Sequence, residues 1–143
     1  MLCDRIKHVI LERFSGYKIL IFIGDVTVFA IVTILGFSSH DTLGTAGLRM
    51  LSTFVSVVIA WLLVAPHLNV YDYDVLTQLH GLWRPVWAMV LSAPMAAFLR
   101  GAWLGTAIIP VFVVVIGGVN ALAIFIWRII CHVLILKWEK KHG

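Results

Sequence analysis

Long apolar stretches separated by short polar segments dominate the chain. The hydrocarbon core of a bilayer is about 30 Å thick, so a helix needs roughly 20 apolar residues to cross it. Four stretches reach that length. The pattern predicts an all-α integral membrane bundle, a single domain over residues 16–138, with four transmembrane helices at about 17–36, 46–66, 85–104 and 107–128.

The two ends of the chain have a different pattern. Within residues 1–15, apolar residues recur at helical spacing with charged residues between them. Such a segment is typical of an amphipathic helix lying in the membrane interface. The alternative is a frayed cytosolic tail. Residues 139–143 form a short basic tail.

Composition supports a membrane protein. Of the 143 residues, 62% are hydrophobic and 13% are charged, and the mean hydropathy is +1.02. An average soluble domain has roughly 45–50% apolar and about 25% charged residues. A soluble fold is therefore excluded, and four spans leave no room for an additional folded soluble domain.

The distribution of charge predicts an orientation. The net charge is +4, and most of the eleven Lys and Arg residues lie in the terminal regions. Basic residues favour the cytoplasmic side and attract anionic lipids. We therefore expect a multi-pass protein of the cell (inner) membrane with both termini cytoplasmic, in contact with membrane lipids and not with nucleic acid. The terminal basic residues are Arg5, Lys7, Arg13, Lys18, Lys137, Lys140 and Lys141.

Asp25 is the most informative residue of the first span. It lies about seven residues inside, or roughly 10 Å deep at 1.5 Å per residue, where a carboxylate costs about 2.5–3.5 kcal/mol. One interpretation is a carboxylate that binds protons or cations. The other is a structural hydrogen bond or an ion pair, with Arg128 or Arg84 as partner.

A second polar group is expected at the outer side of the membrane. Arg49 and Arg100 come from different spans at similar depth, with His40 and Asp41 in the loop above them. These residues suit an anionic headgroup or an acidic solute. Alternatively, the arginines extend to the interface and pair with Asp41. With Asp25 and Arg128, the residues His40, Arg49 and Arg100 form the predicted polar intramembrane cluster.

Small residues mark the expected helix contacts. Ala88, Ser92 and Ala96 recur every fourth residue, as do Gly117 and Ala121. This spacing lets helix backbones approach closely in a membrane.

Pro94 and Asn120 are candidates to line a pocket. Pro94 removes a backbone donor in mid-span and predicts a kink, and a kink beside small residues can frame a cavity. Helix packing is the alternative explanation for both residues.

Chemistry-bearing motifs give little support to an enzyme. The chain has no Gly-rich phosphate loop, HExxH, GxSxG or CxxC motif, so we expect no catalytic residues and no metal site. The histidines show no paired ligand spacing. One histidine suffices as axial ligand to a haem or chlorin, so the identity of any cofactor stays open.

Several strings of residues resemble one family. They are GDVTVFAIVTILGFSSH in the first span and loop, WRPVW and FLRGAWLG in the third span, and PVFVVVIGGVNAL with a closing WR in the fourth. Between about Leu20 and Arg128 the chain resembles the small prokaryotic membrane proteins grouped as domain of unknown function 3054. The chain departs from that family at Phe37, where a basic residue is frequent, and at Thr53-Phe54, where Pro-Phe is frequent.

The resemblance implies four spans but no activity, because the family is uncharacterised. It also implies an intramembrane aspartate, a glycine and a Ser-His pair, an arginine near the end of the third span and a final Trp-Arg. These correspond to Asp25, Gly36, Ser39, His40, Arg100, Trp127 and Arg128.

Two classes of function follow. The first is a small-solute or ion transporter that uses Asp25. The alternative is an accessory, assembly, or pigment- or lipid-binding subunit of a larger membrane complex. Four short helices enclose little space, so either class predicts a homo-oligomer or a larger complex.

Overall fold

The computed structural model describes the backbone of residues 2–39 and 47–142. Side chains are described for residues 16–39, 47–72, 74–76 and 78–137. The described residues form helices and no strands. The elements are α1 (Leu2–Ser39), α2 (Gly47–Val64), the 3-10 turn η1 (Ala65–Leu68), α3 (Tyr73–Thr77), the 3-10 turn η2 (Leu79–Gly81), α4 (Trp83–Leu104) and α5 (Pro110–His142).

Four helical segments are long and apolar enough to cross a membrane. They are Gly16–Ser39, Gly47–Leu68, Leu79–Leu104 and Pro110–Lys137. Each overlaps one of the spans expected from the sequence. The prediction of an all-α membrane bundle with four spans is confirmed.

The first and last helices are longer than a bilayer requires. α1 has 38 residues and α5 has 33, so they extend over about 57 and about 50 Å at 1.5 Å per residue. The segment expected to be an interfacial helix is the first part of α1 and continues into the span without a break. Its placement in the membrane interface stays a prediction.

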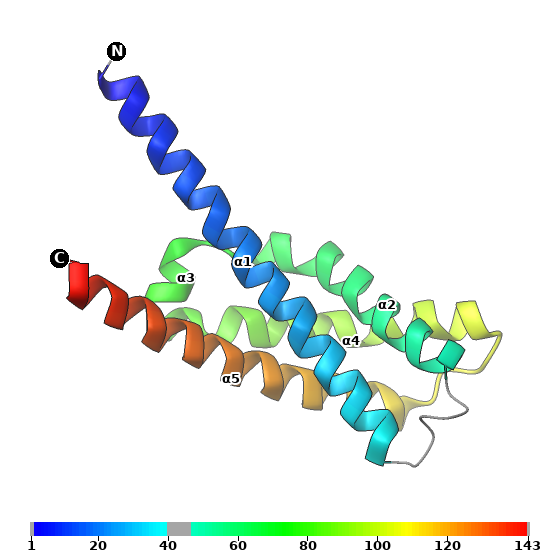
Figure 1. Cartoon of the computed structure of the whole chain (residues 1–143). Coiled ribbons are helices and arrows are strands. Elements are labelled where there is room, and N and C mark those ends of the chain that lie inside the picture. Colours follow the sequence, from blue (N-terminus) through cyan, green and yellow to red (C-terminus); the bar gives the residue numbers. More distant parts are fainter. Residues whose placement is uncertain (1, 40–46, 143) are drawn as a thin grey trace.

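The four long helices close into a ring. α1 packs on α2, α2 on α4, α4 on α5, and α5 returns to α1. Figure 1 shows both termini at one end of the bundle, where α3 also lies, while α1 ends, α2 begins and α4 connects to α5 at the opposite end. This arrangement agrees with an even number of spans.

Small residues bring α2 and α4 together, and this is the most extensive contact between two helices. Ala88 and Ser92 of α4 and Ala60 of α2 are fully buried, and the Ser92 hydroxyl lies 3.3 Å from the Ala60 carbonyl oxygen. On α5, a Cβ added at Gly117 would lie 2.7 Å from the Cβ of Ala93. The close contacts predicted from small-residue spacing are confirmed.

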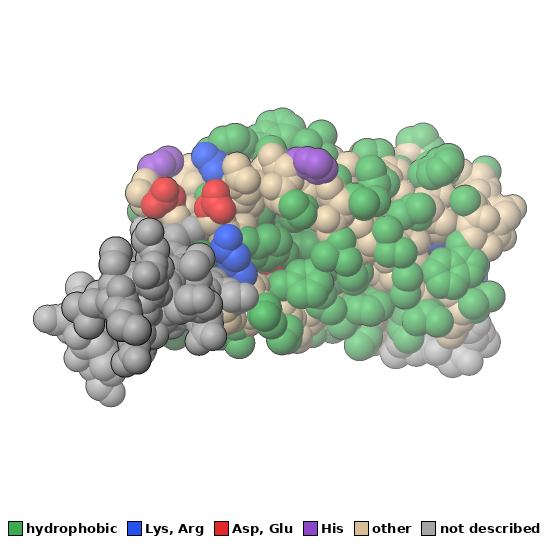
Figure 2. Space-filling view, turned by 90° about the horizontal axis from the view of Figure 1, so that it is seen from above, with side chains coloured by type: hydrophobic (Ala, Val, Ile, Leu, Met, Phe, Trp, Pro, Cys, Tyr) green, Lys and Arg blue, Asp and Glu red, His purple; other side chains and the backbone are tan. Residues whose placement is uncertain are grey.

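Aromatic and aliphatic side chains fill the centre of the ring. Phe29 of α1 meets Trp61 of α2 edge to face, with ring centroids 5.4 Å apart. Val57, Met89 and Ile124 complete this core. Large apolar side chains also cover the outside, and Figure 2 shows them along the length of one face, with the acidic side chains gathered at one end. A surface of that kind suits lipid.

The connection between α2 and α4 is folded into the end of the bundle. Residues 65–82 contain η1, α3 and η2, and Val70, Val75 and Leu76 in this segment are at most 2% exposed. The chain turns at Asn69, which adopts a left-handed conformation with φ of 51°. Asparagine tolerates that conformation better than most residues. We call residues 65–82 the capping segment.

Gly24 sets the distance between α1 and α5. A Cβ at this position would overlap the indole of Trp127. Gly24→Ala is therefore expected to lower the free energy of unfolding by about 1–3 kcal/mol, the usual cost of overpacking. Thermal unfolding in detergent measures the change.

Gly36→Ala is the matched control, because nothing lies within 4 Å of a Cβ added there. It should leave stability unchanged or raise it by up to about 1 kcal/mol, since alanine favours a helix more than glycine. Equal effects of the two substitutions would contradict the close contact with Trp127.

Candidate functional site

An ion pair between the first and last helices lies inside the bundle. Arg128 Nη2 of α5 is 2.8 Å from Asp25 Oδ2 of α1, and both side chains are completely buried. Of the two partners considered for Asp25 from the sequence, Arg128 is the one that the structure pairs with it. Arg84 instead lies over the ring of Trp83, 5.9 Å from its centroid.

Helical periodicity places both charges on inward faces. Ile21, Asp25, Phe29 and Thr33 recur every fourth residue of α1 and are all buried. Residues four apart share one face of a helix, so Asp25 points inward with the apolar residues around it. On α5, Arg128 follows the buried Ile124 by the same interval.

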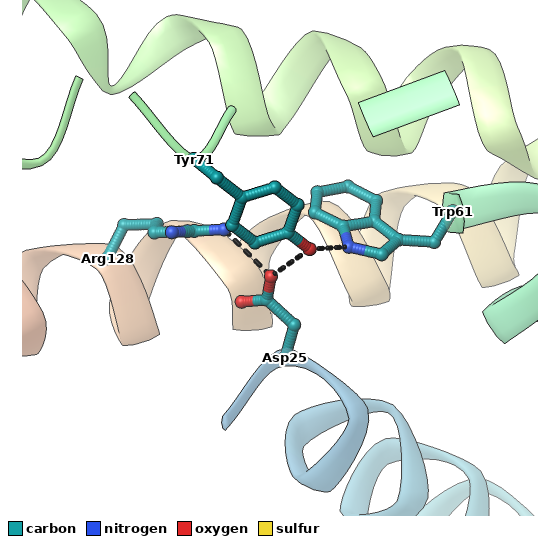
Figure 3. A network of polar contacts seen from close by, with 4 residues as sticks. All are labelled: Asp25, Trp61, Tyr71 and Arg128. Atoms are coloured by element: carbon teal, nitrogen blue, oxygen red, sulfur yellow. Dashed lines mark hydrogen bonds and ion pairs between the residues drawn. The ribbon is translucent and has the colours of Figure 1, made fainter. Parts of the chain in front are cut away.

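Tyr71 and Trp61 extend the pair into a network (Figure 3). The Tyr71 hydroxyl donates to Asp25 Oδ2 at 2.8 Å and accepts from Trp61 Nε1 at 2.7 Å. The guanidinium carbon of Arg128 lies 5.3 Å from the centroid of the Tyr71 ring, within the range of a cation–π contact. Three helices and the capping segment therefore meet at one carboxylate.

The capping segment holds Tyr71 against the ion pair. The Tyr17 hydroxyl donates to the Tyr71 carbonyl oxygen at 3.3 Å, and Lys18 Nζ lies 3.9 Å from Asp72 Oδ1. At the other side, His132 Nδ1 lies 2.9 Å from the Leu76 carbonyl oxygen. Contacts from both α1 and α5 thus fix the position of this segment.

The phenol of Tyr71 is suited to its role as donor. Burial raises the pKa of the Tyr71 hydroxyl above its ordinary value, and the nearby Asp25 carboxylate raises it further. The hydroxyl therefore keeps its proton at physiological pH and can donate it to Asp25 in a hydrogen bond.

Several polar atoms of the network have no hydrogen-bond partner among the described residues. They are Asp25 Oδ1, Arg128 Nε and Nη1, and the neighbouring Trp127 Nε1, all of them buried. Buried polar atoms are usually paired, and leaving one unpaired costs about 1–3 kcal/mol. The centre therefore has hydrogen-bonding capacity beyond what these residues use.

Arg49 and Arg100 form a separate group at the other end of the bundle. Arg100 Nε donates to Thr53 Oγ1 at 2.9 Å, and Thr53 Oγ1 donates to the Arg49 carbonyl oxygen at 2.8 Å. The guanidinium of Arg100 lies 4.6 Å from the centroid of the Phe112 ring. Phe112 precedes Arg128 by sixteen residues of α5, or about 24 Å along the helix.

The predicted polar cluster therefore falls into two groups. Asp25 pairs with Arg128 near one end, and Arg49 lies beside Arg100 near the other. His40 lies outside the described residues, as does Asp41.

Pro94 and Asn120, the candidates for a pocket lining, have different environments. Pro94 faces outward and lies within α4, which continues through it as one helix. Asn120 is 2% exposed and donates to the Ile116 carbonyl oxygen at 2.7 Å. Neither lines the hollow of about 180 Å³ between α1 and α2 or the hollow of about 120 Å³ between α4 and α5.

Within the described part of the chain, no three His, Cys, Asp or Glu side chains lie close enough together to hold a metal ion. His132 and the free thiol Cys131 are both 7% exposed.

Sequence reasoning missed Tyr71 and Trp61 as members of the site. Tyr71 lies between the second and third expected spans, where no feature of the sequence indicates that the chain folds back into the bundle. Trp61 did carry a signal, because it lies inside the second span, whereas the tryptophans of an interface belt lie at span ends.

Taken together, the four spans and the buried polar centre define a multi-pass membrane helix bundle. The chain belongs to the family described as "Protein of unknown function (DUF3054)", whose model matches residues 22–131. The resemblance seen in the sequence is thereby confirmed. Comparisons with the curated proteins and with the solved structures give no match.

Breaking the ion pair from one side should be costly. Asp25→Leu or Arg128→Met leaves one buried charge without its partner, and each is expected to lower the free energy of unfolding by about 3–5 kcal/mol. The double variant should lose much less than the sum, because no charge remains buried. Chemical unfolding in detergent micelles measures all three.

Lys18→Met is the control for breaking an ion pair that is not buried, since the pair of Lys18 with Asp72 is about half exposed. We expect it to change the free energy of unfolding little. Exposed pairs contribute about 0–1 kcal/mol. Strictly additive losses in the double variant would show that Asp25 and Arg128 do not interact.

Proposed function

We propose that this protein is a small-solute or ion transporter whose coupling centre is the Asp25–Arg128 pair. Ionisable residues within the membrane are expensive, and in membrane proteins they commonly mark ion pathways and proton relays. No enzymatic step is part of this proposal.

The observation that carries the proposal is the incomplete hydrogen bonding of the pair. Asp25 Oδ1 and two nitrogens of Arg128 are buried without a partner among the described residues. A pair with a purely structural role gains most when all its polar atoms are satisfied. A centre that receives a proton or a small polar solute, in contrast, needs free acceptor and donor atoms.

Protonation offers a means of coupling. A proton on Asp25 removes the negative charge that holds Arg128 and alters the acceptor of the Tyr71 hydroxyl. The capping segment is tied to the centre through Tyr71 and to α5 through His132 and the Leu76 carbonyl. A change of charge at Asp25 therefore acts directly on the segment that covers this end of the bundle.

An accessory, assembly, or pigment- or lipid-binding subunit is the second candidate. The outer surfaces of the first and fourth spans favour it. Only 22% of the most apolar 18-residue stretch of each of these spans is buried inside the bundle, against 39% and 44% for the second and third spans. Such surfaces suit a second copy or a larger membrane complex. In that case Asp25 and Arg128 serve only to join two helices.

A pH step applied to proteoliposomes on a solid-supported membrane tests the transporter proposal without a known substrate. Proton uptake by a group within the membrane displaces charge, which appears as a transient current. We expect this current from the wild-type protein and its loss in Asp25→Asn.

Asp74→Asn is the matched control, since Asp74 is exposed and lies outside the spans. It should keep the current. A wild-type protein that gives no current, or an Asp25→Asn variant that retains it, would support the accessory role.

We also propose that the protein lies in the inner membrane of the cell with both termini in the cytoplasm. The basic residues of the termini support this orientation. We expect a membrane-impermeant maleimide to label Thr106→Cys in intact cells and Gln78→Cys only after permeabilisation. Both positions are exposed, and Cys3 and Cys131 are replaced by serine beforehand. The reverse labelling pattern would invert the orientation.

A further inference from the structure

We infer that Arg100, with Arg49 beside it, binds the phosphate of an anionic phospholipid at the end of the bundle where α4 meets α5. This inference is independent of the transporter proposal. It rests on how Arg100 is held, on the charge around it and on the hollow next to it.

Arg100 is oriented before any ligand arrives. Thr53 Oγ1 accepts from Nε at 2.9 Å, and the ring of Phe112 supports the guanidinium plane at 4.6 Å. These contacts leave the two terminal nitrogens, Nη1 and Nη2, without a hydrogen-bond partner among the described residues. Two parallel N–H groups on a fixed plane match two phosphate oxygens, and this bidentate geometry is why arginine is favoured at phosphate sites.

The local charge favours an anion. Thr53 Oγ1 connects Arg100 to the backbone of Arg49, so a second arginine lies close to the first. The described carboxylates lie elsewhere: Asp25 is paired with Arg128, and Asp72 and Asp74 belong to the capping segment at the opposite end. Two neighbouring positive charges without a described counter-charge attract a phosphate.

The surroundings favour a lipid as the source of that phosphate. Arg100 lines the hollow of about 120 Å³ together with Ala97, Ile108, Ile109 and Phe112. Arg100 lies one turn before the end of α4, which places it near the level of lipid headgroups. Ile109 and Val111 are 62% and 70% exposed just beyond it, so an acyl chain has an apolar surface to follow while its headgroup stays at the arginines.

Native mass spectrometry of the full chain in mild detergent tests this inference. The delipidated protein is titrated with phosphatidylglycerol and, separately, with phosphatidylcholine of the same acyl chains. We expect preferential retention of phosphatidylglycerol, and a loss of that preference by about ten-fold in Arg100→Gln, which corresponds to one charge-assisted interaction. Arg49→Gln should weaken it less.

Arg84→Gln is the matched control, because it removes the same charge near the opposite end of α4, and it should leave the preference intact. If Arg100→Gln does not fold, Arg100→Lys keeps the charge but loses the planar fork, and a several-fold weaker preference is expected.

Each of the following results would overturn the inference. Two of them concern the preference itself: equal retention of the two lipids by the wild-type protein, and an unchanged preference for phosphatidylglycerol in folded Arg100→Gln. A third is a loss of that preference in Arg84→Gln as large as in Arg100→Gln. A fourth is displacement of phosphatidylglycerol by millimolar inorganic phosphate, which would indicate a site for a free anion. Binding that appears only in Asp41→Asn would overturn it as well, since the arginines would then already be neutralised by the loop carboxylate.

Discussion

A carboxylate buried among membrane helices needs a counter-charge, and the arrangement of this bundle depends on how Asp25 meets that need. Its partner Arg128 is separated from it by 103 positions along the chain, so the ion pair joins the first span to the last and closes the ring α1–α2–α4–α5. The exclusion of water strengthens the attraction between the two charges and equally raises the cost of separating them.

The same carboxylate links the membrane interior to the surface. Tyr71 lies in the capping segment, yet its hydroxyl reaches Asp25 and Trp61 inside the bundle. The position of that segment and the charge of the centre are consequently interdependent. The Arg49–Arg100 group differs from this centre in its position and its contacts. It lies near the opposite end of the bundle, and its contacts are with Thr53 and Phe112.

Hydropathy and spacing were sufficient for the four spans and their close contacts, because apolar length and small-residue intervals are local properties of a sequence. Asp25 and Arg128 were also found from local signals, as charges out of place in apolar spans. Their pairing was left open against Arg84, because depth along a helix does not reveal which way a side chain points around it. Tyr71 could not be predicted as a member of the site, because its position depends on how residues 65–82 fold back into the bundle. Nothing in the sequence indicates that Thr53 orients Arg100.

The contact between Asp25 and Arg128 is the central claim, and a solid-state NMR measurement in lipid bilayers tests it most directly. With labelled aspartate and arginine, the dipolar coupling between the Asp25 carboxyl carbon and the Arg128 guanidinium nitrogens reports their separation, and Arg128→Lys assigns the signal. The account predicts a strong coupling, consistent with an oxygen–nitrogen distance of 2.8 Å. An absent coupling in the folded protein, or one that persists unchanged in Arg128→Lys, would contradict it.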